Sequence, residues 1–204
     1  MSSTIPENKK IQIILAGVRV FARKGYHAVN VEEILRAANV SRATFYAHFE
    51  NKEHLFTTIV DHLLTEQSAY ILEVQERFLS MSRNVVSTIE TIVRRMEQAA
   101  KTNPDALRIY FDVILGSGTQ AEQRFRRMQQ VTLDHFTEMI HQLMQARGYS
   151  SQAAMALAYM LIGGLKDICR MILNGEMTKV RMEEFLQGIK ELFTRKEGFS
   201  GKQS

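Results

Sequence analysis

The stretch of sequence that decides the fold is VEEILRAANVSRATFYAHF, which covers residues 31–49. Its first part, residues 31–38, predicts a short helix, because Asn30 stands where a capping box would begin. The chain then turns at residues 39–40, and Ser41 caps a second helix. Two short helices joined by so brief a turn are typical of a helix-turn-helix.

The two predicted helices separate apolar from polar side chains. The apolar side chains expected to face inward are Ile34, Leu35, Ala38, Val40 and Phe45. The exposed side and its margin hold Arg42, Ala43, Thr44, Tyr46, Ala47 and His48. Such a helix can place its N-terminal side chains against base edges in a DNA groove while hydroxyl, cationic and backbone N–H groups hold phosphates. Arg42 is the leading candidate for reading a base, because a guanidinium can bind guanine through two hydrogen bonds.

Helical spacing of apolar residues continues along the rest of the chain, which holds two prolines in 204 residues. One face of a first helix, ended by Gly25, is expected to hold Ile11, Ile14, Leu15, Val18, Phe21 and Ala22. Further helices are expected over 51–78, 85–101, 122–147 and 150–173, with another begun by Asn103 and Pro104 and a last one over 182–193. The sequence predicts an all-α protein of about nine helices.

Positive charge is concentrated near the N-terminus. Residues 1–55 hold eight Lys and Arg against five Asp and Glu, which is +3 of the net charge of +4, whereas the remaining residues hold 18 against 17. A basic first quarter favours a polyanionic partner. We therefore expect a small DNA-binding domain over residues 1–55 and a larger helical domain over residues 56–204.

The sequence gives no sign of export or membrane insertion. The single cysteine, Cys169, cannot form an internal disulfide, and the polar N-terminal residues do not resemble a secretory signal. The apolar segment 153–165 is too short to span a bilayer. The expected location is the cytoplasm.

The run FARKGYHAVNVEEILRAANVSRATFYAHFENKEHLF, residues 21–56, resembles the signature of the TetR family of bacterial transcriptional regulators. The matching elements include Gly25-Tyr26, Val40-Ser41, Phe45-Tyr46 and His48-Phe49. The resemblance implies a homodimer whose recognition helices enter successive major grooves of a palindromic operator. It also implies a repressor that a small, largely apolar molecule releases from DNA by binding to the C-terminal domain.

The resemblance also assigns residues to the DNA contact. It places Arg42, Ala43 and Thr44 at or near the bases, and Ala43 or Ala47 can contact a thymine methyl group. The positions that resemble phosphate contacts are Tyr46, His48 and Lys52, and Val31 begins the helix that approaches the DNA backbone.

The larger domain is expected to bind the effector and to form the dimer. Polar and polarisable side chains on apolar faces are the effector candidates: Met96, Tyr110, Phe111, Met128, Thr132, His135, Tyr159 and Lys166. Two apolar stripes are the expected dimer seam: Leu157, Leu161, Leu165, Phe185, Leu186, Ile189 and Leu192. The adjacent Gly163 and Gly164 permit close approach of two helices.

The competing class is a metal-dependent enzyme, because helical bundles can hold two iron ions through Glu-x-x-His pairs. Glu138 and His141 form one such pair, with His135 one turn earlier, but a second pair is missing from the sequence. Phosphate-binding loops, dinucleotide-binding fingerprints and nucleophile elbows are also missing. We predict a regulator that is not an enzyme and needs no cofactor or metal.

Overall fold

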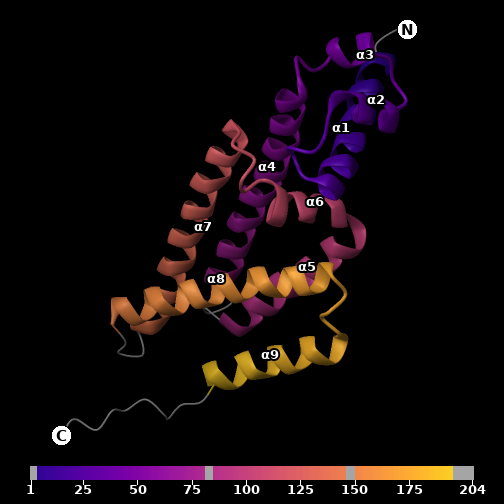
Figure 1. Cartoon of the computed structure of the whole chain (residues 1–204). Coiled ribbons are helices and arrows are strands. Elements are labelled where there is room, and N and C mark those ends of the chain that lie inside the picture. The colour runs from indigo at the N-terminus through magenta and orange to yellow at the C-terminus, as the bar shows by residue number, and fades with distance from the viewer. Residues whose placement is uncertain (1–3, 81–84, 146–149, 195–204) are drawn as a thin grey trace, which may run out of the picture. The chain divides into compact units, whose positions relative to one another are not determined.

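The structure, a computed structural model, describes residues 4–80, 85–145 and 150–194. Within these residues it contains nine α-helices and one π-helix, and no strand (Figure 1). The helices are α1 (Thr4–Lys24), α2 (Val31–Ala38), α3 (Arg42–Tyr46), α4 (Lys52–Ser80), α5 (Val85–Thr102), α6 (Pro104–Arg108), the π-helix η1 (Ile109–Val113), α7 (Gln120–Gln145), α8 (Ser151–Leu173) and α9 (Lys179–Thr194). The predicted all-α class and the nine α-helices are confirmed for the described part of the chain.

The chain divides into two compact units. The first comprises Met1–Leu72 and Ala99–Asp134, and the second comprises Glu73–Gln98 and His135–Ser204. The division falls within α4, α5 and α7, because each of these helices contributes residues to both units. The units describe packing rather than function, so the functional boundary after residue 55 stays a prediction.

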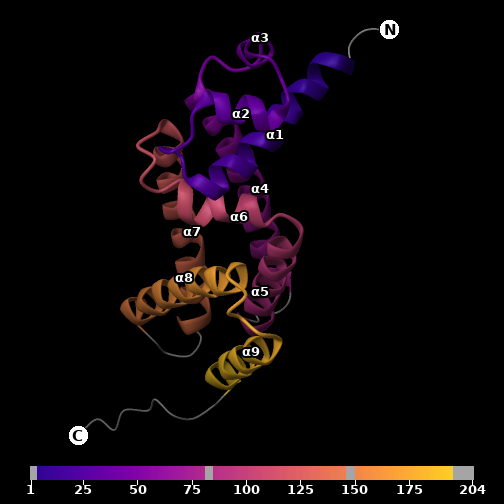
Figure 2. The ribbon, with the colours of Figure 1, turned by 45° about the vertical axis from the view of Figure 1, so that its right-hand side comes forward.

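Aromatic rings form the centre of the first unit. Four phenylalanines, Phe21, Phe45, Phe49 and Phe56, are each at most 1% exposed. The rings of Phe21 and Phe56 meet edge to face with centroids 5.0 Å apart, and those of Phe45 and Phe49 are 5.8 Å apart. Edge-on ring contacts add to the stabilisation from area burial. This core joins α1, α3 and α4, and Figure 2 shows α3 beside α2 at one end of the unit.

The predicted buried face of α1 is confirmed in part. Phe21 is fully buried, and Ile14, Val18 and Ala22 pack partly buried against the core. Ile11 and Leu15 are wrong, at 52% and 53% exposed, and Ile13 and Ala16 are fully buried instead. At Gly17, α1 lies close to α4: a Cβ at this position would be 3.0 Å from side-chain atoms of both Leu55 and Ile59. A pattern built on large apolar residues alone does not predict this close contact.

Helix α6 begins at Pro104 and continues directly into η1. Asn103 occupies the N-cap position and Pro104 the first helical turn, as predicted, but the side chain of Asn103 makes no capping hydrogen bond. In η1 the amide of Ile114 donates to the carbonyl of Ile109 at 3.1 Å, five residues back. Helices α6 and η1 both pack against α1 within the first unit.

A tight turn with two left-handed glycines follows η1. Gly116 and Gly118 have φ of +84° and +67°, which glycine adopts without strain. Their amides donate to Oε2 of Glu122 at 3.1 and 2.9 Å, and Arg126 binds the other carboxylate oxygen. These three donors hold the pKa of Glu122 below its ordinary value, the Gly118 amide contributing most. The carbonyl of Gly116 also lies 2.9 Å from Nε2 of His27.

In the second unit, α8 begins with the side chain of Ser150 accepting from the amide of Ala153 at 3.3 Å. It ends at Asn174 and Gly175 as predicted, with Gly175 at a φ of +72°. Its buried side chains are Ala154, Ala158, Leu165, Ile168 and Cys169. Helix α9 buries Met182 and Ile189.

The opposite side of α8 carries an exposed apolar strip, defined by Met155, Tyr159, Met160, Gly163 and Gly164. The three larger side chains are 51%, 55% and 73% exposed. A Cβ added to either glycine would have no heavy atom within 4 Å. The predicted dimer seam contained other residues of this helix.

Two residues of that predicted seam are buried inside the unit. Leu165 is 6% exposed and Ile189 is 8% exposed, so both have little surface left for a partner. Leu157, Leu161, Phe185 and Leu186 are partly buried, and the side chain of Leu192 lies outside the described residues. The seam itself stays a prediction, and the exposed apolar strip is the surface that could form it.

Candidate DNA-binding site

The position of α2 is fixed at both of its ends. At the start, Oδ1 of Asn30 accepts from the amide of Glu33 at 3.0 Å, and the Glu33 carboxylate accepts from the amide of Asn30 at 3.3 Å. This is the predicted capping box. At the end, Asn39 adopts a left-handed conformation with φ of +49°, and Nε2 of Gln12 donates to the carbonyl of Ala38 at 2.6 Å. The turn that follows α2 is therefore held by backbone geometry and by α1.

Helix α3 is only five residues long and depends on one cap and one anchor. Oγ of Ser41 accepts from the amide of Thr44 at 3.1 Å, as predicted. Phe45, fully buried, anchors the helix in the aromatic core, and Ile34 and Ala38 of α2 are buried beside it in the same cluster. Because the inner side of α3 is occupied in this way, its remaining side chains turn outward.

The outward side of α3 presents the residues that the sequence assigned to DNA. Arg42, Ala43, Tyr46 and Ala47 are exposed, and Thr44 and His48 are partly exposed. Tyr46, 48% exposed, lies edge-on against Phe45 with ring centroids 5.3 Å apart. The surface combines a guanidinium, hydroxyl groups and two methyl groups, the chemistry that reads bases and holds phosphates in a major groove.

Arg42 has a partner that sequence reasoning missed. Its Nη2 forms an ion pair with Oε1 of Glu32, and the two side chains are 63% and 54% exposed. Glu32 lies in the first turn of α2 and Arg42 in the first turn of α3, ten positions later. No local spacing rule relates these two positions, since only the helix-turn-helix geometry brings them together.

Lys52 occupies a different environment from the one expected for a phosphate contact. Its ammonium donates to the carbonyls of Tyr26 and Val29 at 2.9 and 2.8 Å, and it lies 4.4 Å from the centroid of the Tyr26 ring. Burial lowers the pKa of Lys52 below its ordinary value. The side chain fastens the connection between α1 and α2 to the start of α4, and only one of its three N–H groups is left for a phosphate.

Val31 begins α2 as predicted and packs, partly buried, against the aromatic core. Its side chain therefore contributes to packing. If the start of α2 contacts the DNA backbone, the contact is therefore made by other, exposed groups in the first turn of α2. That role of Val31 stays a prediction.

The effector candidates of the first unit have packing partners. Tyr110 is buried, its ring meets Phe125 edge to face, and its hydroxyl accepts from Nε2 of Gln129 at 2.8 Å. Phe111 and Met128 pack against the same core. The hydroxyl of Thr132 donates to the carbonyl of Met128 at 2.9 Å, one helical turn earlier. These contacts explain the four residues as parts of the fold, and their role towards a ligand stays a prediction.

The effector candidates of the second unit are more varied. Tyr159 belongs to the exposed apolar strip, and Met96 is partly buried. Nδ1 of His135 is buried without a hydrogen-bond partner among the described residues. Burial, with a smaller effect of Arg170, lowers the pKa of Lys166. His135 is thus the candidate in this unit whose buried polar atom has no hydrogen-bond partner among the described residues.

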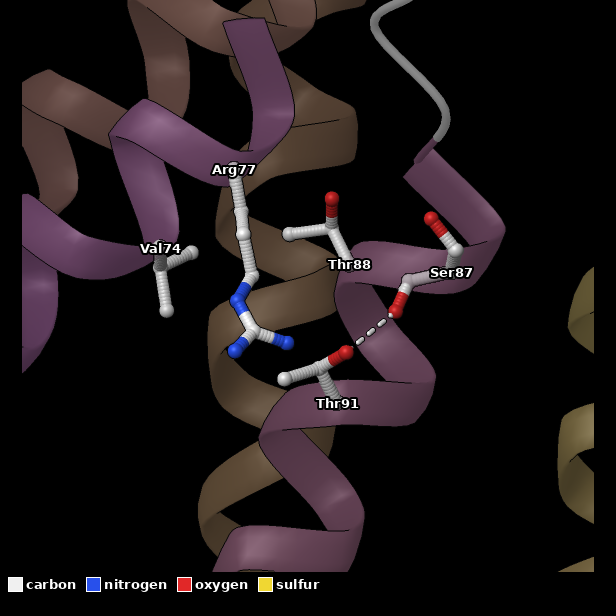
Figure 3. A pocket seen from close by; sticks show the side chains of 5 residues that line it. All are labelled: Val74, Arg77, Ser87, Thr88 and Thr91. Carbon is white, nitrogen blue, oxygen red and sulfur yellow. Dashed lines mark hydrogen bonds between the residues drawn. The ribbon is translucent and has the colours of Figure 1, made fainter. Parts of the chain in front are cut away.

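A small hollow in the second unit lies between α4 and α5 (Figure 3). It is lined by Val74, Arg77, Ser87, Thr88 and Thr91, and its cavity volume is about 10 Å³. None of the predicted effector residues lines it. Pockets for small ligands are usually larger, about 300–1,000 Å³, so this hollow does not account for an effector site.

The metal-enzyme alternative finds no support in the described residues. Among them, no group of three His, Cys, Asp or Glu side chains could hold a metal ion. Nδ1 of His141 lies 4.0 Å from the Glu138 carboxylate, and its Nε2 lies 3.0 Å from the hydroxyl of Ser151. The pair is explained as a surface contact between α7 and α8.

Helices α2 and α3 are joined by three residues, 39–41, and α3 presents its polar side outward. The first unit therefore contains a helix-turn-helix of DNA-binding type. Residues 13–59 match the family model described as "Bacterial regulatory proteins, tetR family". The helix-turn-helix of this chain is thus of the TetR type.

Curated relatives are similar over part of their length. YhgD, an HTH-type transcriptional regulator of Bacillus subtilis (strain 168), is 29% identical over 134 residues, 65% of this chain and 68% of YhgD. IcaR of Staphylococcus epidermidis, a negative regulator of a biofilm operon, is 24% identical over 128 residues, 50% of this chain and 69% of IcaR. The match to YerO of B. subtilis, 33% identical, spans 40% of this chain and 23% of YerO. These relatives are regulators, in agreement with the prediction that the chain is not an enzyme.

Solved structures share the fold over nearly the whole chain. FadR of Bacillus subtilis, in complex with stearoyl-CoA, has a TM-score of 0.62 and 17% identity, covering 92% of this chain and 99% of FadR. AibR, in complex with isovaleryl coenzyme A and operator DNA, has a TM-score of 0.65 and 16% identity, covering 90% of this chain and 97% of AibR. The likeness establishes the fold beyond the helix-turn-helix. In the described part of the chain, no helix has the length and apolar character needed to cross a membrane.

Proposed function

We propose that this protein is a ligand-responsive transcriptional repressor that binds double-stranded DNA through α3. The observation that carries the proposal is the outward face of α3, where Arg42, Ala43, Tyr46 and Ala47 are exposed over a fully buried Phe45. Arg42 reads guanine, and the hydroxyls and His48 contact phosphates. The chromosome is its partner, which places it in the cytoplasm.

The proposed operator is palindromic because the proposed repressor is a homodimer. Two copies related by a two-fold axis present two α3 helices, which suit half-sites about 34–36 Å apart, one turn of B-DNA. The exposed apolar strip of α8 supports this assembly, because Met155, Tyr159 and Met160 leave apolar surface that a second copy can cover. Gly163 and Gly164 leave room for a closely packed helix.

The proposed effector is a small, largely apolar molecule that releases the protein from its operator. The acyl-CoA complexes of FadR and AibR, which share this fold, support an acyl thioester as the first class to examine. A ligand lowers operator affinity only by binding better to a state that fits the operator worse. Acyl-CoAs of increasing chain length, titrated against the protein–operator complex, are expected to include one that releases the DNA, and release by none would refute this effector class.

The DNA-binding proposal is tested by selecting bound sequences from a random duplex library. We expect a palindrome whose affinity falls steeply with salt, since several phosphate contacts release counterions. An Arg42→Ala variant is expected to lose discrimination at one base pair in each half-site, by about 1–3 kcal/mol. Selection of no sequence by the wild-type protein would refute the proposal.

The dimer is tested with Met160→Glu, which places a charge in the exposed apolar strip at its most exposed side chain. We expect monomers in sedimentation, with an unchanged unfolding temperature of the first unit. Leu115→Glu, an exposed apolar residue of the first unit, is the matched control and leaves the dimer intact. A dimeric Met160→Glu protein would show that another surface forms the interface.

A further inference from the structure

We propose that Glu32 is a specificity-determining residue that positions Arg42 for base reading and disfavours binding to DNA of other sequence. The inference rests on the proposed function, because it concerns the same DNA surface. Its starting point is the ion pair between Oε1 of Glu32 and Nη2 of Arg42. Neither composition nor the capping pattern of α2 assigns a role to Glu32, whose neighbour Glu33 makes the capping box.

The hydrogen bonding of the pair is compatible with base reading. An arginine guanidinium has five N–H groups in a rigid plane, and Nη2 carries two of them. Glu32 uses one, so Arg42 keeps enough donors in the same plane to bind O6 and N7 of guanine together. The carboxylate thus restricts the guanidinium to one orientation before DNA arrives without occupying its reading edge.

The backbone that carries the Glu32 carboxylate is held in a fixed position. Glu32 stands in the first turn of α2, where a negative charge is favoured by the helix dipole. That turn is fixed by the capping box of Asn30 and Glu33. An arginine that would otherwise have many rotamers is therefore held against a rigid element, which reduces the entropy lost when it binds a base.

The negative charge of Glu32 also acts on every DNA that approaches. It is 54% exposed beside the proposed contact surface, so it repels phosphates whatever the sequence. At the right guanine this cost is offset by the oriented contact of Arg42. At any other base, no Arg42 contact offsets the phosphate repulsion. Glu32 therefore lowers the affinity for DNA in general and raises the discrimination between the selected operator and other sequences.

The experiment compares full-length wild-type protein with Glu32→Gln, which keeps the shape of the side chain and removes its charge. Each protein is titrated with the selected operator, with the same operator carrying adenine in place of the guanine assigned to Arg42, and with random duplex. The discrimination ratio is the ratio of the dissociation constants for the substituted and the selected operator. Glu50→Gln is the matched control, because Glu50 is an exposed carboxylate of the same domain outside the Arg42 ion pair.

We expect Glu32→Gln to bind random duplex more tightly and to lose about two- to fivefold in the discrimination ratio, the scale of one exposed ion pair. Glu50→Gln is expected to leave the ratio unchanged. In an Arg42→Ala background, Glu32→Gln no longer alters the ratio, since the two residues act as a unit. Equal unfolding temperatures of wild type and Glu32→Gln separate this effect from a purely structural one.

Two kinds of failure are distinguishable. If Arg42→Ala loses discrimination while Glu32→Gln retains the wild-type ratio, Arg42 reads the base alone and the inference about Glu32 is overturned. If Arg42→Ala itself discriminates as the wild type does, the proposed base reader is wrong and the role of Glu32 is overturned with it. Selection of no operator by the wild type would overturn the proposed function as a whole.

Discussion

The aromatic core of the first unit and helix α8 of the second differ in how far their large apolar side chains are buried. Around Phe45 and Phe56 the largest side chains are fully enclosed by the chain itself. On α8 the enclosed side chains include the small Ala154 and Ala158, while Met160 is 73% exposed. The difference indicates that the aromatic core is enclosed within one chain, whereas α8 leaves large apolar side chains exposed.

Of the substitutions that test this difference in burial, Phe45→Ala is expected to lower the free energy of unfolding most. Removing a fully buried ring leaves a cavity beneath α3, and such substitutions cost about 3–5 kcal/mol. Chemical denaturation monitored by circular dichroism measures the loss. Tyr46→Ala, next in the chain but 48% exposed, is the control and is expected to change stability by less than about 1 kcal/mol. Similar losses for both would mean that the core does not depend on the inner side of α3.

A smaller effect is expected from Gly17→Ala. The added Cβ would lie 3.0 Å from side-chain atoms of both Leu55 and Ile59, so α1 and α4 must separate slightly. Overpacking of this kind costs about 1–3 kcal/mol. The free energy of unfolding measures it, and a gain of about 1 kcal/mol, the helix preference of alanine over glycine, would show that the Leu55 and Ile59 side chains adjust without strain.

Gly164→Ala makes the same change where the chain leaves open space. Alanine favours a helix over glycine by about 1 kcal/mol, so the expected result is a gain in stability, opposite in sign to Gly17→Ala. Unfolding at low protein concentration, where a dimer would dissociate, isolates this gain. If the gain disappears at high concentration, a partner helix lies close to Gly164, which sharpens the comparison between the two regions.

The smallest expected effect concerns pH and Glu122. Hydrogen bonds from Gly118, Arg126 and Gly116 lower the pKa of this carboxyl in the folded state. Its contribution to stability is therefore present above the ordinary glutamate pKa of about 4.3 and is lost as the pH falls through the lowered value. Glu122→Gln is expected to flatten the loss of stability below about pH 4.3. An unchanged acid profile in this variant would assign the loss to other carboxylates.

Much of the first unit could be predicted because its signals are local. Asn30 and Glu33, Ser41, and Gly25 each act through backbone groups within a few residues, so their spacing is visible in the sequence. The exposed residues of α3 followed from the same spacing. The family run over residues 21–56 added the DNA-contact assignment.

Other features could not be predicted, because they depend on residues distant in sequence. The close approach of α1 to α4 joins Gly17 to Leu55 and Ile59, about 40 residues later. The carbonyls that bind Lys52 lie 23 and 26 residues away. On α8, periodicity gives the helix but does not distinguish the side buried by the chain from the side left exposed, since both carry apolar residues.

The π-helix η1 has a consequence for the tolerance of the chain to deletion. Its hydrogen bond from Ile114 to Ile109 encloses one residue more than an α-helical turn does. Loss of a single codon between these positions would convert the π turn into an α turn without removing a backbone hydrogen bond. The residues after the turn would keep their places relative to Ile109, so Ile114, now fully buried, and the glycine turn after it would stay in register. A chain one residue shorter here would thus preserve both the helix and its packing.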